Sequence, residues 1–237
     1  MTVPSPRKPV FDAVRAICPP GLFDDPGHVL ALDNLLDAFG AARIAAHKLG
    51  DPGRFFAAIA PTTKVLNPVQ VDTINGLLKQ AAHWPIGWLA YGLATAWHEA
   101  LLTPIREIGR GGRRAYAARG KYGQPQYGRG LVQLTWDKNY EWADHAASAV
   151  GLIPEGALLA NFDLALRPDL AAFILVRGME TGAFTGKSLS HCLPAPETPT
   201  HRQFVDARRI INGTDRAQLV ADYAVRFLAA LKSGGWA

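Results

Sequence analysis

The stretch from Gln80 to His98 contains no Asp, Glu, Lys or Arg, and no other part of this chain runs so long without a charge. Pro85 can open a helix there, and Pro104 requires that helix to end before it, because proline disfavours helical backbone in the residue that precedes it. The stretch includes His83 and other residues that suit a protein interior better than a bilayer. We therefore expect a buried helix over residues 86–102 and no membrane span.

Helical patterns also predominate in the rest of the chain. Three further helices are expected over residues 135–151, 168–182 and 214–233. Thr135 is the expected N-cap of the first of them, and Thr214 or Asp215 is the expected N-cap of the last. Only residues 130–135 alternate in the manner of a short strand. The fold class predicted from these patterns is mainly α, with little or no sheet.

The composition fits a folded domain with a sizeable core. The chain has 237 residues, of which 49% are apolar and 19% are charged, and this excludes a disordered protein. Two cysteines, Cys18 and Cys192, are too few for a disulfide framework and match no metal-ligand spacing. A reducing compartment is therefore expected, with no metal and no cofactor. Residues 1–10 are rich in proline, lack the apolar run of a signal peptide, and are expected to form a loose arm.

Residues 1–80 contain a weak internal repeat. The apolar residues Val29, Leu32, Leu35 and Leu36 recur 42 positions later as Val71, Ile74, Leu77 and Leu78. Two ordinary amphipathic helices would give this pattern, and so would a duplicated module, although two copies are too few for a solenoid. We expect residues 1–80 to form an N-terminal helical segment, either a separate binding module or a packing element, and residues 81–237 to form the main domain.

Glu99 is the first charged residue after Lys79, and it lies near the end of the uncharged helix. A buried carboxylate is costly unless it has a partner or a purpose, and burial favours the protonated group that a general acid needs. The alternative is a helix-end glutamate that faces outward. His98 and Glu99 also begin a zinc-protease motif, but Leu102 stands where the second histidine would be, which excludes that motif.

A second carboxylate, Glu107, lies beyond the Pro104 break and therefore on a different element. Two carboxylates that face each other across a cleft are the minimum apparatus for glycosidic hydrolysis, one as acid and one as base. Two glutamates this close in sequence are also common by chance.

Residues 106–129 are strongly basic. They contain seven Lys and Arg residues and one acid, a local net charge of +6 in a chain whose net charge is +5. Tyr116, Tyr122, Tyr127 and many glycines lie between the basic residues. This pattern fits an arm that binds nucleic acid, the wall of a cleft in which tyrosines stack on sugar rings, or a solvated loop. A pI near 9.4 adds only a preference for an anionic partner.

Four segments resemble glycoside hydrolase family 19, which contains chitinases and phage lysins. The clearest is Tyr127–Tyr140, which reads Tyr-Gly-Arg-Gly-Leu-Val-Gln-Leu-Thr-Trp-Asp-Lys-Asn-Tyr. The His98–Glu99 pair at the end of an apolar helix and the Ile-Ile-Asn-Gly segment at 210–213 are similar to two further motifs of the family. Residues 177–187 resemble its phage and prophage branch. The matches follow the family's order over residues ~85–232.

The resemblance implies a lysozyme-like fold with two lobes and a central cleft, which inverts the anomeric configuration on cleaving a β-1,4 bond to N-acetylglucosamine or its muramic-acid relative. It implies that Glu99 is the general acid and that Thr135 helps to hold the attacking water. The Arg106–Glu107 pair is similar to one in the phage-like branch, which implies that Glu107 is the base. The remaining implied positions are substrate contacts, namely His98, Tyr127, Arg129, Gln133, Asn139, Asn212 and Arg216.

The expected function is therefore that of an endolysin, an antimicrobial peptidoglycan hydrolase of a bacteriophage or prophage, with its catalytic domain in residues 81–237. Such an enzyme would stay in the host cytoplasm until a separate protein released it to the cell wall. The expected partner is bacterial peptidoglycan, and we expect a monomer that neither binds nucleic acid nor inserts stably into a membrane. The alternatives are a chitinase and a non-catalytic protein that binds cell walls or nucleic acid.

Overall fold

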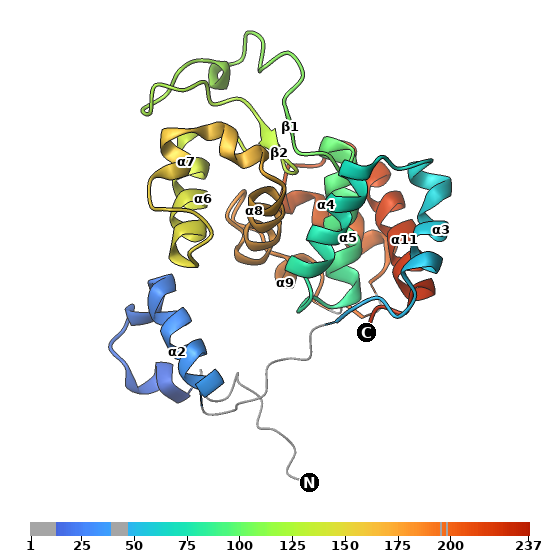
Figure 1. Cartoon of the computed structure of the whole chain (residues 1–237), viewed down its shortest axis with the longest axis horizontal. Coiled ribbons are helices and arrows are strands. Elements are labelled where there is room, and N and C mark those ends of the chain that lie inside the picture. The colour runs from blue at the N-terminus through green and yellow to red at the C-terminus, as the bar shows by residue number, and fades with distance from the viewer. Residues whose placement is uncertain (1–12, 39–46, 195, 198) are drawn as a thin grey trace.

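A computed structural model describes residues 13–38, 47–194, 196–197 and 199–237 of the chain. Its α-helices are α2 (Pro26–Ala38), α3 (Pro52–Thr63), α4 (Pro68–Gln80), α5 (Ile86–Ala100), α6 (Asp137–Ala149), α7 (Ala157–Ala160), α8 (Pro168–Thr181), α9 (Leu189–Cys192), α10 (His201–Ala207) and α11 (Ala217–Ser233). Short 3-10 helices are η1 (Leu22–Asp24), η2 (Ala115–Ala117), η3 (Phe162–Leu166) and η4 (Arg208–Ile210). The predicted mainly α fold is confirmed (Figure 1).

The one sheet within the described residues has two very short strands, β1 (Ile105–Arg106) and β2 (Arg129–Gly130), paired antiparallel. The strand expected over residues 130–135 is therefore wrong beyond its first residue. The chain turns back instead, because the backbone N–H of Leu134 donates to the carbonyl of Arg129 over 2.8 Å and Gln133 has a φ of 52°. This turn, rather than a strand, carries the polar residues of the family-like motif.

The uncharged stretch forms α5, as predicted. Ten of its residues are buried, and it lies alongside α11 (Figure 1). The helix ends at Ala100 because Leu101 and Leu102 adopt left-handed backbone, with φ of 48° and 57°, before Pro104. Leu102 is fully buried and anchors this turn in the core. The end of α5 is thereby fixed, and Glu99 lies in its last turn.

The helix over 168–181 also forms as predicted, but both predicted N-caps are wrong. Asp137 is the first residue of α6, and its backbone N–H donates to the side chain of Gln126. A residue from another segment, and not Thr135, therefore accepts the hydrogen bond at the beginning of this helix. In α11 the N-cap position is occupied by Arg216 in left-handed backbone, and no side chain caps it. The apolar residues Val220, Ala224, Phe227, Leu228 and Leu231 of α11 are buried, and Tyr223 is partly covered.

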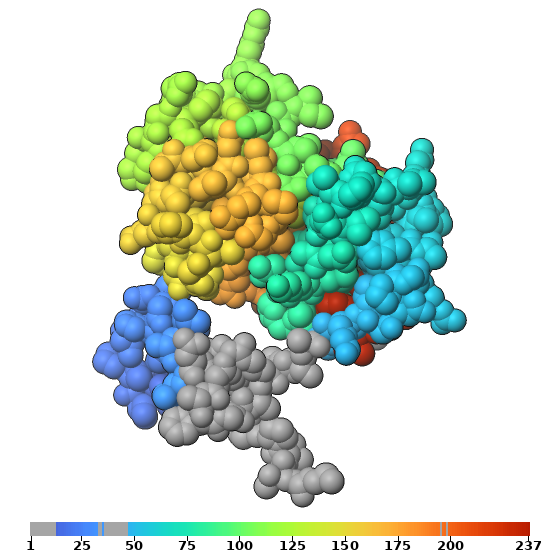
Figure 2. Space-filling view, in the orientation of Figure 1, coloured from blue at the N-terminus to red at the C-terminus, as the bar shows by residue number. Residues whose placement is uncertain are grey.

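Helices α3 and α4 belong to the same core as α5 and α11. Phe55 and Ile59 of α3 are buried on the side of α11, while Ile74 and Leu77 of α4 are buried near α8. Helix α2 stands apart from this group, close to α6 (Figure 1). In the space-filling view of Figure 2, α2 (blue) likewise lies apart from α3 (cyan).

The two halves of the weak repeat therefore have different surroundings. In α2, Leu32 is buried but Val29 and Leu35 are exposed, whereas the matching stripe of α4 faces the core. The division of the chain at residue 80 stays a prediction. The loose arm expected over residues 1–10 lies outside the described residues.

Across the described ranges, no helix is both long enough and apolar enough to cross a bilayer. Cys18 and Cys192 are both free thiols.

Candidate active site

An open cleft of about 550 Å³ lies where the end of α5 meets the loop between β1 and β2. The segment that follows β2 and the segment that follows η4 form its other walls. The cleft is lined by Glu99, Ile105, Glu107, Ile108, Arg114, Tyr116, Val132, Gln133, Thr135, Ile211 and Asn212. Five of the predicted site residues, namely Glu99, Glu107, Gln133, Thr135 and Asn212, are thus brought together from segments far apart in the sequence.

Glu99 is held at this cleft by an arginine. The Nη1 atom of Arg208 donates to Oε1 of Glu99 over 2.6 Å, and Nε of the same arginine donates to the carbonyl oxygen of Asp215 over 2.9 Å. The side chain of Arg208 is 2% exposed and that of Glu99 is 17% exposed. In the part of the chain that the structure describes, Oε2 of Glu99 has no hydrogen-bond partner, so one carboxyl oxygen is fixed and the other is available to a ligand.

Sequence reasoning missed Arg208. The residue precedes the Ile-Ile-Asn-Gly segment and belongs to a pair of adjacent arginines, which gives no sign that one of them is buried. The outward-facing alternative for Glu99 does not fit its position, because most of its side chain is covered and it lines the cleft.

His98, the neighbour of Glu99, is half-buried but does not line the cleft. Burial lowers the pKa of His98, although the charge of Glu99 acts in the opposite direction. A neutral imidazole is therefore favoured beside the carboxyl group. The structure places His98 next to Glu99 rather than in the wall of the cleft.

Glu107 follows β1 directly and is held by three groups. The hydroxyl of Tyr116 donates to Oε1 over 2.8 Å, and the backbone N–H of Gly128 donates to Oε2 over 3.2 Å. The Nη1 atom of Arg114 lies 3.8 Å from Oε1. Both oxygens of Glu107 are hydrogen-bond acceptors, and the backbone N–H of Glu107 also donates to the carbonyl of Gly128 over 2.7 Å. The second carboxylate is therefore fixed in the wall of the same cleft.

Two glycines make the tight turn beneath Glu107 possible. A Cβ atom at Gly128 would lie 2.8 Å from Oε1 of Gln133, and one at Gly130, where φ is 78°, would lie 2.7 Å from the carbonyl oxygen of Ala165. The first contact would displace the side chain of Gln133, and the second, with backbone, would displace the turn itself. With glycine at both positions, Nε2 of Gln133 donates to the carbonyls of Gly130 and Ile105 over 3.1 and 3.3 Å. Gln133 is thereby held at the cleft in its left-handed backbone conformation.

Thr135 also lines the cleft, and its hydroxyl has no hydrogen-bond partner among the described residues. Its carbonyl oxygen accepts a hydrogen bond of 2.9 Å from the side chain of Asn139. Asn139 thus supports the backbone of Thr135 and is not itself in the cleft wall. The hydroxyl of Thr135 is free to bind a water molecule or a substrate.

Tyr127 and Arg129 lie behind the cleft wall instead of in it. Arg129 is 3% exposed, and its Nη1 atom donates to the carbonyls of Pro125 and Tyr127 and to the hydroxyl of Tyr140. Its guanidinium carbon lies 3.9 Å from the ring centre of Tyr127, in cation–π contact. Arg216 is placed elsewhere, at a separate surface hollow at the beginning of α11. The structure does not bring these three residues to the cleft.

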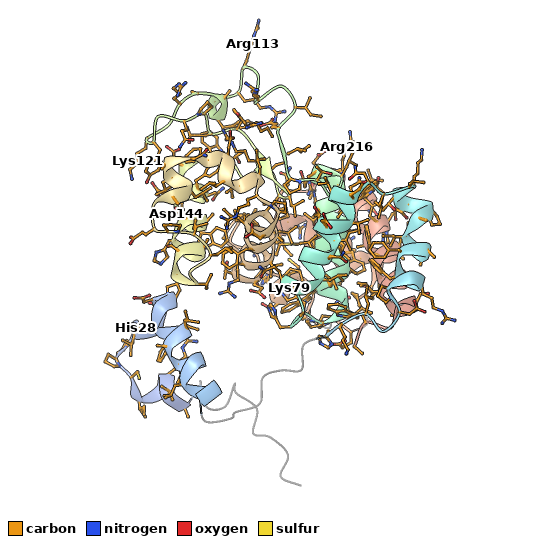
Figure 3. The ribbon with its side chains drawn as sticks, viewed as in Figure 1. His28, Lys79, Arg113, Lys121, Asp144 and Arg216 are labelled. Carbon is orange, nitrogen blue, oxygen red and sulfur yellow. The ribbon has the colours of Figure 1, made fainter. Side chains whose placement is uncertain are left out.

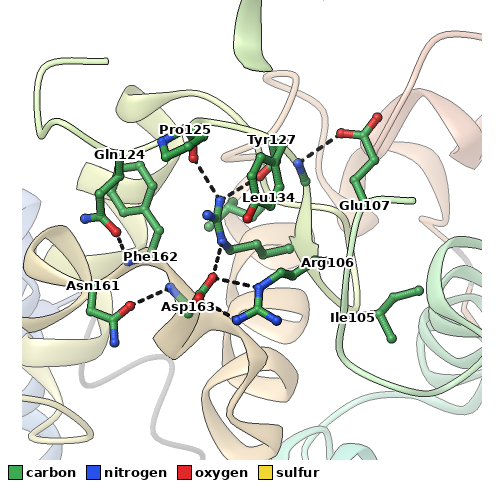
Figure 4. Close-up of polar contacts among 12 residues, drawn as sticks. Ile105, Arg106, Glu107, Gln124, Pro125, Tyr127, Leu134, Asn161, Phe162 and Asp163 are labelled. Atoms are coloured by element: carbon green, nitrogen blue, oxygen red, sulfur yellow. Dashed lines mark hydrogen bonds and ion pairs between the residues drawn. The ribbon is translucent and has the colours of Figure 1, made fainter. Parts of the chain in front are cut away.

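Asp163 pairs with Arg129 behind the cleft wall, a contact that was not predicted from sequence. It accepts hydrogen bonds from Nη2 of Arg106 over 2.6 Å and from Nε of Arg129 over 2.7 Å (Figure 4). The hydrogen bond from Arg106 is the main reason that the pKa of Asp163 is lowered to about 2. Arg106 lies in β1 and Arg129 lies in β2, so their ion pairs with Asp163 connect both strands to η3.

Most of the basic residues in 106–129 have partners. Arg106 and Arg129 pair with Asp163, Lys121 pairs with Glu141, and Arg114 lies near Glu107. Among the described residues, Arg110, Arg113 and Arg119 have no ion pair, although Arg119 donates to the carbonyl of Gly123. Arg113 projects from the tip of the loop (Figure 3). The positive charge that is free to meet a ligand is therefore much smaller than the local net charge of +6. No group of three or more His, Cys, Asp or Glu side chains able to hold a metal ion occurs in the described ranges.

Two solved structures are similar to this chain, a bacterial family 19 chitinase and chitinase C from Streptomyces griseus HUT6037. Each is 23% identical over 76% of this chain, with a TM-score of 0.44, and the match covers 85% of the first and 67% of the second. Neither a protein-family model nor a curated protein sequence matches the chain. At this level of likeness, the function has to be argued from the site itself.

Proposed function

We propose that this chain is a glycoside hydrolase that cleaves the β-1,4 bond of the bacterial cell-wall glycan by acid and base catalysis, with inversion at the anomeric carbon. The observation that carries the proposal is the meeting of Glu99 and Glu107 in one open cleft, together with a free threonine hydroxyl. The two carboxylates come from different elements and are each held by dedicated donors. Two carboxylates in one cleft are the minimum apparatus for acid and base catalysis of glycosidic hydrolysis.

Glu99 acts as the general acid in this proposal. Arg208 fixes Oε1, and Oε2 is left to donate a proton to the glycosidic oxygen as the bond breaks. Glu99 is mostly covered at the end of a nearly uncharged helix and lines the cleft, and this position supports the role. The neutral state favoured for His98 adds no positive charge beside it.

Glu107 acts as the general base. It takes a proton from a water molecule, which then attacks the anomeric carbon from the opposite face of the sugar. Tyr116, Arg114 and the backbone of Gly128 hold the carboxylate as an acceptor, and the hydroxyl of Thr135 helps to orient the water. Gln133 and Asn212 line the same cleft and are proposed to bind the polar groups of the sugar rings.

Peptidoglycan is the proposed substrate, and the enzyme is proposed to be an endolysin of the phage or prophage type. Arg110 and Arg113 lie on the loop beside the cleft and have no ion-pair partner in the described part of the chain. Cations without a carboxylate partner on that loop favour a polymer that carries carboxylate or phosphate groups over an uncharged one. A chitinase activity on poly-N-acetylglucosamine would use the same two carboxylates and is the alternative outcome of the test.

The test is a digestion of purified peptidoglycan and, separately, of the hexamer of β-1,4-linked N-acetylglucosamine. The new reducing-end sugar is identified by mass spectrometry, and the anomer formed first is identified by proton NMR. Release of muropeptides with the α-anomer formed first supports an inverting peptidoglycan hydrolase. Cleavage of the hexamer alone would make the chain a chitinase, and cleavage of neither would contradict the proposal.

A further inference from the structure

Trp136 is the exposed tryptophan of this chain. All six tryptophans lie in the described ranges, and the other five are buried or partly covered, whereas Trp136 is 45% exposed. A large aromatic ring in water forgoes the gain of about 25 cal/mol per Å² that burial brings. One exposed ring alone needs no explanation, but this one has two further unusual features.

The first feature is its backbone. Trp136 has a φ of 70° and a ψ of 138°, a strained conformation that bulky residues rarely adopt. The conformation is held from both sides. The backbone N–H of Trp136 donates to the carbonyl of Gln126 over 3.2 Å, and its own carbonyl accepts from the N–H groups of Asn139 and Tyr140. A glycine would meet these demands without strain, yet a tryptophan stands there.

The second feature is its place beside the cleft. Trp136 follows Thr135 directly, and its ring meets that of Tyr116 edge to face, with ring centres 5.8 Å apart and an interplanar angle of 83°. Thr135 and Tyr116 both line the cleft, so the indole continues the same wall outward. Its Nε1–H group has no acceptor among the described residues. The indole thus offers an apolar face and a free donor at the edge of the proposed active site.

We propose that Trp136 binds an N-acetylhexosamine ring of the glycan at a position next to the reacting bond, an inference that rests on the proposed function. One face of a β-linked sugar ring presents C–H groups and packs on an aromatic ring, while its hydroxyl and acetamide oxygens accept hydrogen bonds. The indole supplies both partners. Because Tyr116 contacts Trp136 and also donates to Glu107, the bound ring lies next to the carboxylate that activates water.

The test compares Trp136→Gly with Trp136→Phe. Trp136→Gly removes the ring and suits the positive φ, so it is expected to keep a cooperative thermal transition. We expect its KM for the N-acetylglucosamine hexamer, or for soluble glycan strands if the hexamer is not cleaved, to rise about tenfold. Its kcat is expected to stay within about threefold. Trp136→Phe, which keeps a ring, is expected to recover most of the lost affinity.

Binding is measured apart from turnover in a Glu99→Gln background. Sugar titration is expected to change the tryptophan emission of Glu99→Gln, and the change is expected to disappear when Trp136→Gly is added. Trp142→Phe is the matched control, because Trp142 of α6 packs against Phe184. This variant is expected to leave both KM and the emission change unaltered.

An unchanged KM in Trp136→Gly, or an emission change that survives it, would overturn the role of Trp136 while the hydrolase proposal stands. A fall in kcat with KM unaltered would also overturn it, since that result describes a residue that only supports Tyr116. If the wild-type chain cleaves neither glycan, the proposed function fails first, and sugar titration of the intact chain still tests whether Trp136 binds the ring.

Discussion

Arg208 donates from Nη1 to Oε1 of Glu99 over 2.6 Å, across 109 positions of sequence. The arginine is almost fully buried, and its Nε atom is fixed in turn by the carbonyl of Asp215. The orientation of the proposed general acid therefore depends on a residue that does not line the cleft. This dependence gives a first test of the site that does not alter either carboxylate.

Replacement of Arg208 by methionine is expected to lower kcat by about 100-fold or more, because Glu99 loses the donor that orients it. It is also expected to reduce the free energy of unfolding by about 3 kcal/mol, since it leaves a mostly covered carboxylate without its partner. Kinetics and denaturant unfolding measure the two effects. Arg202→Met is the matched control, since Arg202 is exposed and pairs with Asp206 rather than with a residue of the cleft. Equal kcat values for the two variants would contradict the role given to Arg208.

Replacement of Tyr116 by phenylalanine is expected to lower kcat about tenfold with little change in Tm. The variant keeps the ring that meets Trp136 and loses only the hydroxyl that donates to Glu107. Tyr122→Phe is a matched control, because the hydroxyl of Tyr122 donates to Glu141 away from the cleft. If both variants retain full activity, Glu107 does not depend on Tyr116, and its role as base loses support.

Acid is expected to weaken the ion pairs that connect β1 and β2 to Asp163 of η3. The pKa of Asp163 is about 2 in the folded chain against an ordinary value of 3.8, so its contribution to stability is complete above about pH 4 and is lost as the pH falls from 4 to 2. Because the side chain is 37% exposed and partly screened, that contribution is about 1 kcal/mol. Denaturant unfolding of Asp163→Asn and wild type between pH 2 and 7 measures it. A stability difference that does not narrow below pH 4 would count against this assignment.

Truncation tests the role of the N-terminal segment. Removal of residues 1–46 is expected to leave a cooperatively folding protein, because the core helices begin at α3. Removal of residues 1–80 is expected to abolish cooperative unfolding, since it takes away Phe55, Ile59, Ile74 and Leu77 and exposes the faces of α8 and α11 that they cover. Calorimetry distinguishes these outcomes. A stable, cooperatively folding 81–237 fragment would instead support a division of the chain at residue 80.

The ends of the helices were predictable because single residues close to each end determine them. Pro85 and Pro104 delimit α5, and Pro168 and Gly182 delimit α8, so single residues with restricted or special backbone were enough. The N-caps of α6 and α11 were not predictable, since the first N–H of α6 is satisfied by Gln126 from another segment. Local sequence carries no information about a partner that arrives through tertiary structure.

The site residues also divide into those that the local sequence identifies and those that depend on a partner distant in sequence. Glu99 stood out because it follows a long uncharged stretch, and the segment around Gln133 and Thr135 stood out through its resemblance to glycoside hydrolase family 19. Arg208 and Asp163 did not, because each acts on a partner more than 30 positions away and resembles any other charged residue in sequence. Arg129 was expected to contact substrate, and the structure buries it with Asp163, where its charge holds the fold.

The most direct test of the central claim is the release of muropeptides from purified peptidoglycan by wild type and Glu99→Gln, with Glu180→Gln as a control carboxylate outside the cleft. The wild type and Glu180→Gln are expected to release fragments with a new reducing-end sugar. Glu99→Gln is expected to release at least 1,000-fold less while it keeps a cooperative thermal transition, as expected for the loss of a general acid from a cleft that otherwise stays intact. Undiminished release by Glu99→Gln would contradict the account.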